Sequence, residues 1–210
     1  MFQTVEKGVI VSASVTSPTP LPSRGGRPAG ATPEEVLREA RRAFNAGVRV
    51  DARAIAEKLG ISRTSIYRWY GARDGLMGAV LAAEFRYLVD TCEVTTGPSA
   101  GRIKATVLAV SATMAHHAPF AAYLSDHKLE ALRVITASDG RVQPASVARV
   151  REMIDQAIQR DGYQPRLESE LLAYTLIRLV DGFVYTSYDD SRVALNTDLS
   201  QLDAVLTALL

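Results

Sequence analysis

The chain has a single cysteine, no long apolar run and almost no net charge. With Cys92 alone among 210 residues, no disulfide can form within the chain. No stretch approaches the ~20 consecutive apolar residues of a membrane helix. Val9–Val15 is too short for a secretory signal and lacks its charged and cleavage-site residues. These absences argue against a secreted or membrane-spanning protein and favour a cytoplasmic one.

Residue groupings typical of catalytic and metal sites are also missing. His116 and His117 are adjacent, so on a helix they point about 100° apart and cannot chelate one metal together, and His127 lies on another expected element. Asp189 and Asp190 lack the glycine-centred spacing of a calcium loop. No Gly-rich phosphate loop follows a strand. We therefore expect no catalytic residue, no bound metal and no cofactor.

The net charge of +1 conceals a separation of charge along the chain. Residues 24–73 hold eleven Lys and Arg against five Asp and Glu, whereas residues 97–210 hold eleven against thirteen. Basic side chains that neutralise phosphates supply most of the sequence-independent affinity for DNA. The basic region is therefore the candidate nucleic-acid-binding part of the chain, and the later region an acidic body.

Two short helices joined by a tight turn are predicted within residues 52–71, ARAIAEKLGISRTSIYRWYG. The inner positions expected on the first helix are apolar or small: Ala54, Ile55, Ala56 and Leu59. This helix ends at Gly60, which tolerates the left-handed backbone of a helix terminus. Ser62 offers an N-cap to the second helix and places Ile66 and Tyr70, four residues apart, on its inner face. The pattern predicts a helix-turn-helix.

The outer face of the second helix carries side chains suited to a DNA groove. Arg can pair with guanine, Ser and Thr can bond base edges, and a phenolic hydroxyl can bond a phosphate. The predicted DNA-contacting residues are Ser62, Arg63, Thr64, Ser65, Tyr67, Arg68, Trp69 and Arg73. Arg73 would hold a backbone phosphate at the start of the next helix. A solvated helical hairpin is the alternative, but the coincidence of cap, turn and basic face favours DNA.

The stretch Ile61–Leu81, ISRTSIYRWYGARDGLMGAVL, resembles the end of the DNA-binding domain of TetR-family regulators. In that family the recognition helix ends in Tyr-x-x-aromatic, here Tyr67 and Tyr70. The next helix starts with a basic-acidic-x-Leu pattern, here residues 73–76. Within the family, residues 46–51 and the segment Tyr-Arg-Trp-Tyr-Gly are similar to regulators of quorum-signal degradation of the QsdR type.

Composition and periodicity divide the chain into three regions. Residues 1–31 are rich in Ser, Thr, Pro and Gly without periodicity, and we expect a disordered basic arm. Residues 32–72 are expected to form a three-helix head, in which Thr32 caps a helix that begins at Pro33. Residues 73–210 are expected to form a helical body for ligand binding and dimerisation, since no alternating strand pattern is present. The predicted fold class is all-α.

The arm contains the segment RGGRP at residues 24–28. It is similar to arginine-bearing arms that enter the minor groove of DNA. A flexible basic tail that only attracts phosphates is the simpler interpretation, and we favour it.

The body is expected to consist of consecutive helices interrupted at glycine and proline. The predicted segments are 73–92, 99–116, 120–125, 127–137, 144–161, 168–188 and 198–209. Two of these helices, 144–161 and 168–188, carry more apolar positions than one body needs, which suggests a pairing face. These positions are Val147, Val150, Ile154, Ile158, Leu171, Leu172, Leu176, Leu179 and Phe183. The family resemblance implies a four-helix bundle between two copies, so a homodimer would present two reading helices one DNA turn apart.

Polar and aromatic residues interrupt the apolar faces of the body and mark a candidate ligand site. They are Met114, His117, Phe120, Tyr123, Tyr174, Arg178 and Asp181. Arg178 and Asp181 could form an internal ion pair or receive a polar ligand group, and each residue alone is more simply explained as structural. Together they suit a mainly apolar pocket. The resemblance to the QsdR type suggests a lactone with an alkyl chain as the effector.

These features predict a homodimeric repressor that binds an operator in double-stranded DNA and is released when a small molecule fills the body. The helix 73–92 would act as a lever. An all-α enzyme or metabolite-binding protein with the helix-turn-helix as scaffold is one alternative, and it predicts no salt-dependent duplex binding. A protein-interaction module that uses Tyr67, Trp69 and Tyr70 is another, and it predicts affinity insensitive to salt.

Overall fold

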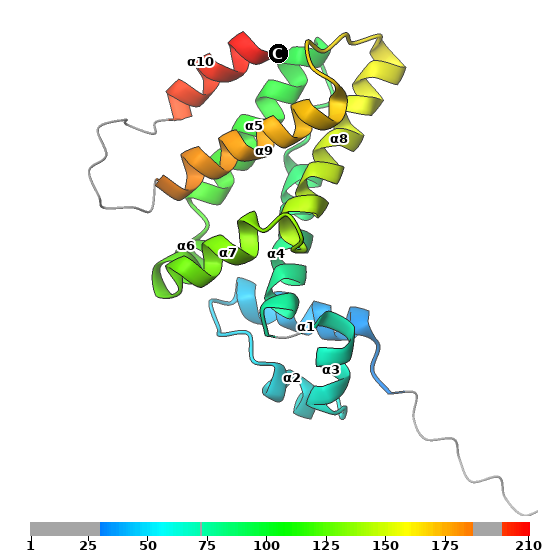
Figure 1. Ribbon diagram of the computed structural model, residues 1–210, viewed down its shortest axis with the longest axis vertical. Helices are drawn as coiled ribbons and strands as arrows, with labels where there is room; N and C mark the ends of the chain where they lie inside the picture. The colour runs from blue at the N-terminus through cyan, green and yellow to red at the C-terminus, as the bar shows by residue number, and fades with distance from the viewer. Residues whose placement is uncertain (1–29, 72, 187–198) are drawn as a thin grey trace, which may run out of the picture.

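The computed structural model describes residues 30–71, 73–186 and 199–210. This part of the chain forms ten α-helices and no strand, so the predicted all-α fold is confirmed. Figure 1 shows α1 to α3 gathered in a head at one end, a helical body at the other, and α4 running from one into the other. No helix among the described residues has the length and hydropathy of a membrane span. Nearly all of the arm predicted at residues 1–31 lies outside the described residues.

The head begins with α1, whose start is the predicted one. The three helices of the head are α1 (Pro33–Asn45), α2 (Ala52–Lys58) and α3 (Arg63–Tyr70). The Thr32 hydroxyl accepts from the Glu35 N–H at 3.3 Å, and the Glu35 carboxylate accepts from the Thr32 N–H at 2.9 Å. This capping box satisfies two N–H groups that a helix start leaves unpaired. The face of α1 that covers the other two helices buries Val36, Ala40 and Phe44.

The turn after α2 forms at Gly60 as predicted. Gly60 has φ +64°, and the N–H of Ile61 reaches back to the carbonyl of Ala56 at 3.0 Å. This is a Schellman arrangement, which needs a left-handed residue where a side chain would be strained. The prediction for Ala54 is wrong, because its side chain is exposed. At about 100° per residue it lies across the helix from Ile55 and Ala56, which are the buried positions.

The start and the inner face of α3 also match the prediction. The Ser62 Oγ accepts from the Ser65 N–H at 3.1 Å, which is an N-cap. Ile66 is fully buried and Tyr70 nearly so. The Tyr70 hydroxyl donates to the Pro33 carbonyl at 2.5 Å, and this hydrogen bond links the end of α3 to the first turn of α1.

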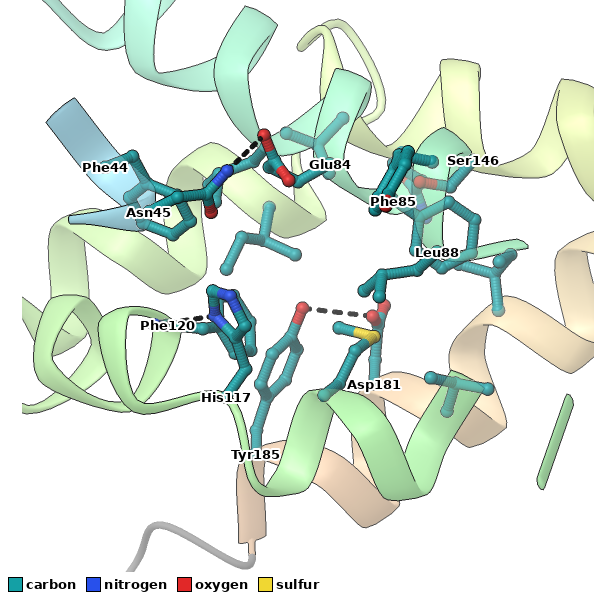
Figure 2. A pocket seen from close by; sticks show the side chains of 18 residues that line it. Phe44, Asn45, Glu84, Phe85, Leu88, His117, Phe120, Ser146, Asp181 and Tyr185 are labelled. Atoms are coloured by element: carbon teal, nitrogen blue, oxygen red, sulfur yellow. Dashed lines mark hydrogen bonds between the residues drawn. The ribbon is translucent and has the colours of Figure 1, made fainter. Parts of the chain in front are cut away.

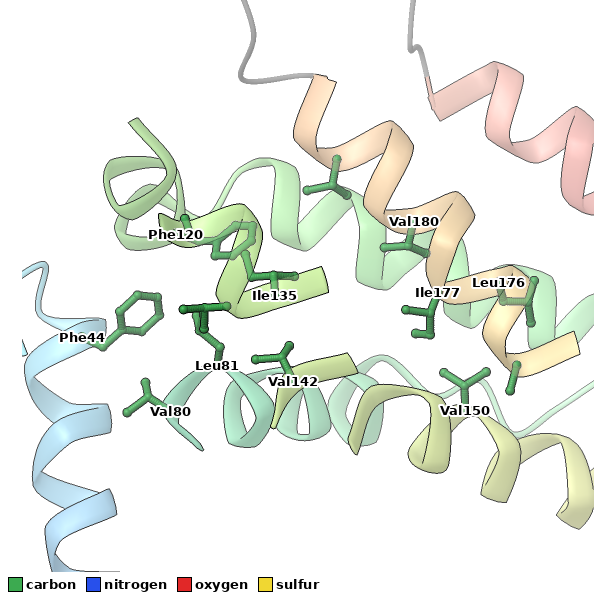
Figure 3. Packing of buried hydrophobic residues seen from close by; sticks show 14 of the residues in the cluster. Phe44, Val80, Leu81, Phe120, Ile135, Val142, Val150, Leu176, Ile177 and Val180 are labelled. Carbon is green, nitrogen blue, oxygen red and sulfur yellow. The ribbon is translucent and has the colours of Figure 1, made fainter. Parts of the chain in front are cut away.

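The long helix α4 (Arg73–Cys92) connects head and body, and its bounds are those predicted. Its 20 residues span ~30 Å. Figure 3 shows Phe44 of α1 facing Val80 and Leu81 of α4, with Phe120 and Ile135 of the body beside them. These residues belong to one buried cluster. Head and body therefore share a continuous core, and a displacement of α4 would change the packing of both.

The body completes the all-helical chain with six further helices. They are α5 (Ser99–Ala115), α6 (Ala118–Asp126), α7 (Lys128–Thr136), α8 (Val142–Asp161), α9 (Ser169–Thr186) and α10 (Leu199–Leu209). Their bounds agree closely with the predicted segments, except that the predicted residues 187, 188 and 198 lie outside the described part of the chain. In Figure 1, α8 and α9 lie against each other, and the short α6 and α7 fill the space between the body and the head.

Four positions predicted to lie on an outer pairing face are core positions of the chain itself. Val150, Ile154, Leu172 and Leu176 are almost completely buried. The reason is that α8 packs against both α4 and α9, and α9 also packs against α5. Leu171, on the opposite side of α9, is 52% exposed. The remaining predicted positions, Val147, Ile158, Leu179 and Phe183, are partly buried.

Candidate functional site

The outer side of α3 presents the predicted DNA-contacting side chains. Ser62, Arg63, Thr64 and Arg68 are exposed, and Ser65, Tyr67 and Trp69 are partly buried. The Arg63 guanidinium lies over the Tyr67 ring, 5.3 Å from its centroid. The side chain of Arg73 lies outside the described part. The structure thus gathers seven of the eight predicted residues on one helix and its cap.

Ser62 and Trp69, two of these seven residues, have structural roles within the head. The Ser62 hydroxyl is occupied as the N-cap of α3 and lies 3.0 Å from the Ser65 hydroxyl. The Trp69 ring packs against the hydrophobic core. In the described structure Arg63 and Thr64 neither cap a helix nor pack against the core, so they are better placed than Ser62 and Trp69 to meet a base edge.

The C-terminal end of α3 is held by the body. Arg141, the residue before α8, donates from its Nη2 atom to the carbonyls of Trp69 and Tyr70, at 3.3 and 3.5 Å. Its guanidinium also lies 5.7 Å from the centre of the Tyr70 ring. The last carbonyls of a helix have no partner within the helix, so an arginine there caps it. Nearby, Arg133 of α7 forms an ion pair with Asp74 in the first turn of α4. The α7–α8 corner therefore contacts both ends of the α3–α4 junction.

A cavity of about 260 Å³ lies in the body beside α4. Figure 2 shows side chains from the end of α1, from α4, from α6 and the residue before it, and from α8 and α9 around it. The lining residues are Phe44, Asn45, Leu81, Glu84, Phe85, Tyr87, Leu88, Met114, His117, Phe120, Ile135, Val142, Gln143, Ser146, Ile177, Val180, Asp181 and Tyr185. Most of them are apolar, which suits a small organic ligand.

The structure brings four of the seven predicted ligand-binding residues to this cavity. They are Met114, His117, Phe120 and Asp181. Tyr123 instead lines a second hollow, of about 250 Å³, between α6 and the connection from α1 to α2. Tyr174 is 46% exposed on the outer side of α9. Arg178 does not line the cavity but reaches the Asp181 carboxylate from outside it.

Several polar groups of the cavity are absent from the predicted set. Tyr185 lies one helical turn after Asp181, and this i, i+4 spacing is a signal that the sequence contains. Gln143 and Ser146 are polar residues at i, i+3 on the buried face of α8. Asn45 and Glu84 meet there only because the end of α1 packs against α4, and no local pattern indicates this contact.

A carboxylate and a phenol form the polar part of the α9 wall. The Tyr185 hydroxyl donates to Asp181 Oδ1 at 3.1 Å, and Arg178 donates to Oδ2 at 3.2 Å. Burial disfavours the ionised carboxylate and raises the pKa of Asp181 to about 6. Burial, with the neighbouring Asp181 carboxylate, also raises the pKa of Tyr185 well above its ordinary value. The phenol is therefore a neutral hydrogen-bond donor at every physiological pH.

The opposite wall holds a second carboxylate, which is already paired. Glu84 Oε1 accepts from Arg41 Nε at 2.6 Å and from Asn45 Nδ2 at 3.1 Å. His117 caps α6, because its Nδ1 accepts from the Phe120 N–H at 3.2 Å, and its ring stacks on that of Phe44. None of the lining residues in the described part of the chain is Lys or Arg. His, Cys, Asp and Glu nowhere gather in threes at metal-binding geometry among the residues described.

The second half of the chain matches a family model, and the whole resembles solved regulators. Residues 99–210 match the Tetracyclin repressor-like, C-terminal domain. The transcriptional repressor QsdR of the TetR family from R. erythropolis superposes with a TM-score of 0.74 at 19% identity, over 85% of this chain and 93% of that chain. No curated protein matches the sequence.

Two further solved structures match over most of the chain with lower TM-scores. The regulator FadR from Bacillus subtilis, in complex with stearoyl-CoA, has a TM-score of 0.47 at 12% identity, over 84% of this chain and 96% of that chain. A tetR-family regulator from Streptomyces coelicolor has a TM-score of 0.44 at 21% identity, over 84% and 83%. The family model covers more than half of the chain, and the fold places a helix-turn-helix head on a body with a cavity. The chain belongs to the TetR family of DNA-binding, ligand-responsive transcriptional regulators.

Proposed function

We propose that this protein is a cytoplasmic, homodimeric repressor of the QsdR type, released from its operator when a small molecule enters the cavity beside α4. One observation carries the proposal: α4 forms part of the cavity wall and also begins at the end of α3. Ligand and DNA would therefore act on one helix from its two ends. The fold shared with QsdR is consistent with this assignment.

The operator would be read by α3 in the major groove of double-stranded DNA. Arg63 and Thr64 would contact base edges, and Tyr67 and Arg68 would contact phosphates, with Arg73 at the start of α4. Ser65 and Trp69 lie behind these side chains and would support them. The basic arm would add phosphate attraction.

A homodimer would set the distance between two such helices. Leu171 and Tyr174 are large apolar side chains exposed on the outer side of α9, and exposed apolar surface of this kind marks association sites. Pairing of α8 and α9 with the same helices of a second copy would cover them. Two reading helices about 34 Å apart would then enter successive major grooves.

The effector would act by linkage. The ligand would bind more tightly to the conformation in which the two α3 helices cannot enter successive grooves. Operator affinity would then fall by the ratio of the ligand's affinities for the two conformations, commonly ~1–3 kcal/mol in free energy. The apolar lining of the cavity suits an alkyl chain. A lactone with an alkyl chain fits the volume of the cavity, and it is uncharged, in keeping with a wall whose described residues include no Lys or Arg.

Selection of duplexes from a random library by the full chain, followed by affinity measurements at two salt concentrations, tests the proposal. With six to ten phosphate contacts, affinity should fall by about 10³ to 10⁵ between 50 and 200 mM salt. Addition of an alkyl lactone should release the selected duplex. Failure to enrich any sequence, or affinity insensitive to salt, contradicts a DNA-reading role, and conversion of the added lactone would indicate an enzyme.

A further inference from the structure

We infer that the cavity takes an uncharged ligand whose polar group hydrogen-bonds to Gln143 and Ser146. Binding of this group would be coupled to α3 through the first turn of α8 and Arg141. The second half of the inference, the coupling of ligand binding to α3, rests on the proposed function. Its first half concerns the cavity alone and is tested without DNA.

Gln143 and Ser146 are buried polar side chains that face the cavity. They are 6% and 4% exposed, and both line it. Neither side chain makes a hydrogen bond to another residue that the structure describes, and their polar atoms are open to the cavity rather than sealed from it. Polar groups open to a cavity are completed by water or by a ligand group, so this pair is available to bind the polar group of a ligand that displaces water. An amide and a hydroxyl one turn apart can together bind a carbonyl or a hydroxyl group.

The charges around the cavity select against an anionic ligand. Among the described residues, its wall contains two carboxylates, Glu84 and Asp181, and no Lys or Arg. A ligand carboxylate or phosphate buried against these described residues would lack a lining cation to pair with, which is costly. A cationic ligand gains little, because Arg41 already pairs with Glu84 and Arg178 with Asp181. An uncharged ligand is therefore favoured.

The same turn of α8 is in contact with the DNA-binding head. Arg141 lies two residues before Gln143 and holds the last carbonyls of α3. The start of α8 also rests closely on α4: a side chain added at Gly78 would lie 3.5 Å from the Arg141 Cβ atom. Any shift of this turn on ligand binding must therefore change the contact between Arg141 and the Trp69 and Tyr70 carbonyls.

Calorimetric titration of the full chain with three eight-carbon probes tests the ligand class. Octanamide is neutral, octanoate is an anion and octylammonium is a cation, and all three carry the same alkyl chain. At pH 7.5 octanamide should bind, and octanoate should bind at least about tenfold more weakly. Failure of octanamide to bind, or equal or tighter binding of either charged probe, overturns the assignment.

Substitutions on α8 test the residues. Gln143→Leu should weaken octanamide about tenfold and Ser146→Ala by a smaller factor, because each removes a hydrogen bond to the ligand. Gln159→Leu is the matched control, since Gln159 is exposed on the same helix outside the cavity and should leave affinity unchanged. A circular-dichroism melt verifies that each variant is folded. Unchanged affinity in folded Gln143→Leu contradicts the assignment.

Arg141→Gln tests the coupling between ligand binding and α3. The variant should bind octanamide within about twofold of the parent chain, yet octanamide should release a selected operator duplex from it at least about fivefold less effectively. Arg151→Gln, an exposed arginine elsewhere on α8, is the control and should respond normally. A full ligand response in Arg141→Gln contradicts the coupling. If no duplex can be selected at all, the proposed function fails, whereas the calorimetric result on the ligand class still stands.

Discussion

Asp181 is the residue whose ionisation is most clearly coupled to folding. Burial raises its pKa from 3.8 to about 6. The folded chain thus holds this proton more tightly than the unfolded chain, so the group favours folding below about pH 4. That contribution is lost as the pH rises through 6.

Asp181→Asn should therefore stabilise the protein at high pH and not at low pH. The amide avoids the cost of burying a charge, and its single carbonyl oxygen can still accept from Tyr185, although the exposed bond from Arg178 is lost. At pH 8 the free energy of unfolding should rise by about 1–3 kcal/mol, and the difference from the parent chain should shrink towards zero by pH 4. Urea unfolding of both proteins across this range measures it. A difference that does not vary with pH would show that charge burial is not its source.

Arg63 and Arg73 should have separable roles in DNA binding. Arg63→Ala should relax base preference, because its exposed guanidinium at the start of α3 can pair with a guanine. Arg73→Ala should weaken all duplexes alike and reduce the salt slope by about one unit. Affinities for the selected duplex and single-base variants, at several salt concentrations, distinguish the two. Equal losses with unaltered preference would reverse these assignments.

Among the elements, α3 and α4 meet at a corner that leaves no room for a side chain at Gly75. A Cβ atom placed on Gly75 would lie 1.8 Å from the carbonyl oxygen of Tyr70, which is the last residue of α3. The obstacle is backbone, so it cannot be relieved by a rotamer change. The corner therefore requires glycine in the first turn of α4, where the family-like basic-acidic-x-Leu pattern also stands.

Gly75→Ala should lower the free energy of unfolding by about 1–3 kcal/mol and weaken operator binding, because α3 and α4 must move apart. Gly101→Ala is the matched control. Gly101 is also helical, a Cβ atom there meets open space, and the exchange should be neutral or stabilise the chain by up to about 1 kcal/mol. Thermal melts of both variants measure the contrast. Similar stability of the two would mean that the corner is looser than described.

The lever role of α4 can be tested by tethering its first turn. Asp74 and Arg133 form an ion pair between α4 and α7. With both changed to cysteine and Cys92 changed to serine, a short thiol crosslinker should abolish ligand-induced release and leave operator binding intact. The same protein without crosslinker is the control. Unchanged release in the crosslinked protein would argue against movement of α4 relative to α7.

For the whole molecule, the central question is how two heads are held at a fixed distance. Leu171→Glu combined with Tyr174→Glu should convert a dimer into monomers, because charge would replace apolar surface at the proposed contact of α8 and α9. Leu129→Glu is the control, since Leu129 on α7 is 85% exposed and lies outside that face. Sedimentation velocity measures the state of each variant. A dimer that survives the double substitution places the interface elsewhere.

Helix bounds and the reading motif were predictable because their causes are local. Thr32, Gly60 and Ser62 act on backbone groups within a few residues, so caps and turns can be identified without knowledge of the rest of the fold. The spacing that buries Ile66 and Tyr70 is likewise a property of one helix. The sequence by itself therefore determined the all-α class, the helix-turn-helix and the exposed basic side of α3.

Only the tertiary structure decided which side chains surround the cavity and which apolar residues remain outside. Asn45 and Gln143 line one cavity although nearly a hundred positions separate them, since α1 and α8 both pack against α4. Leu171 and Leu172 are neighbours of equal hydropathy, yet the first is exposed and the second is core. Periodicity defines a face but not the element that covers it, because burial depends on contacts between segments that no local pattern encodes.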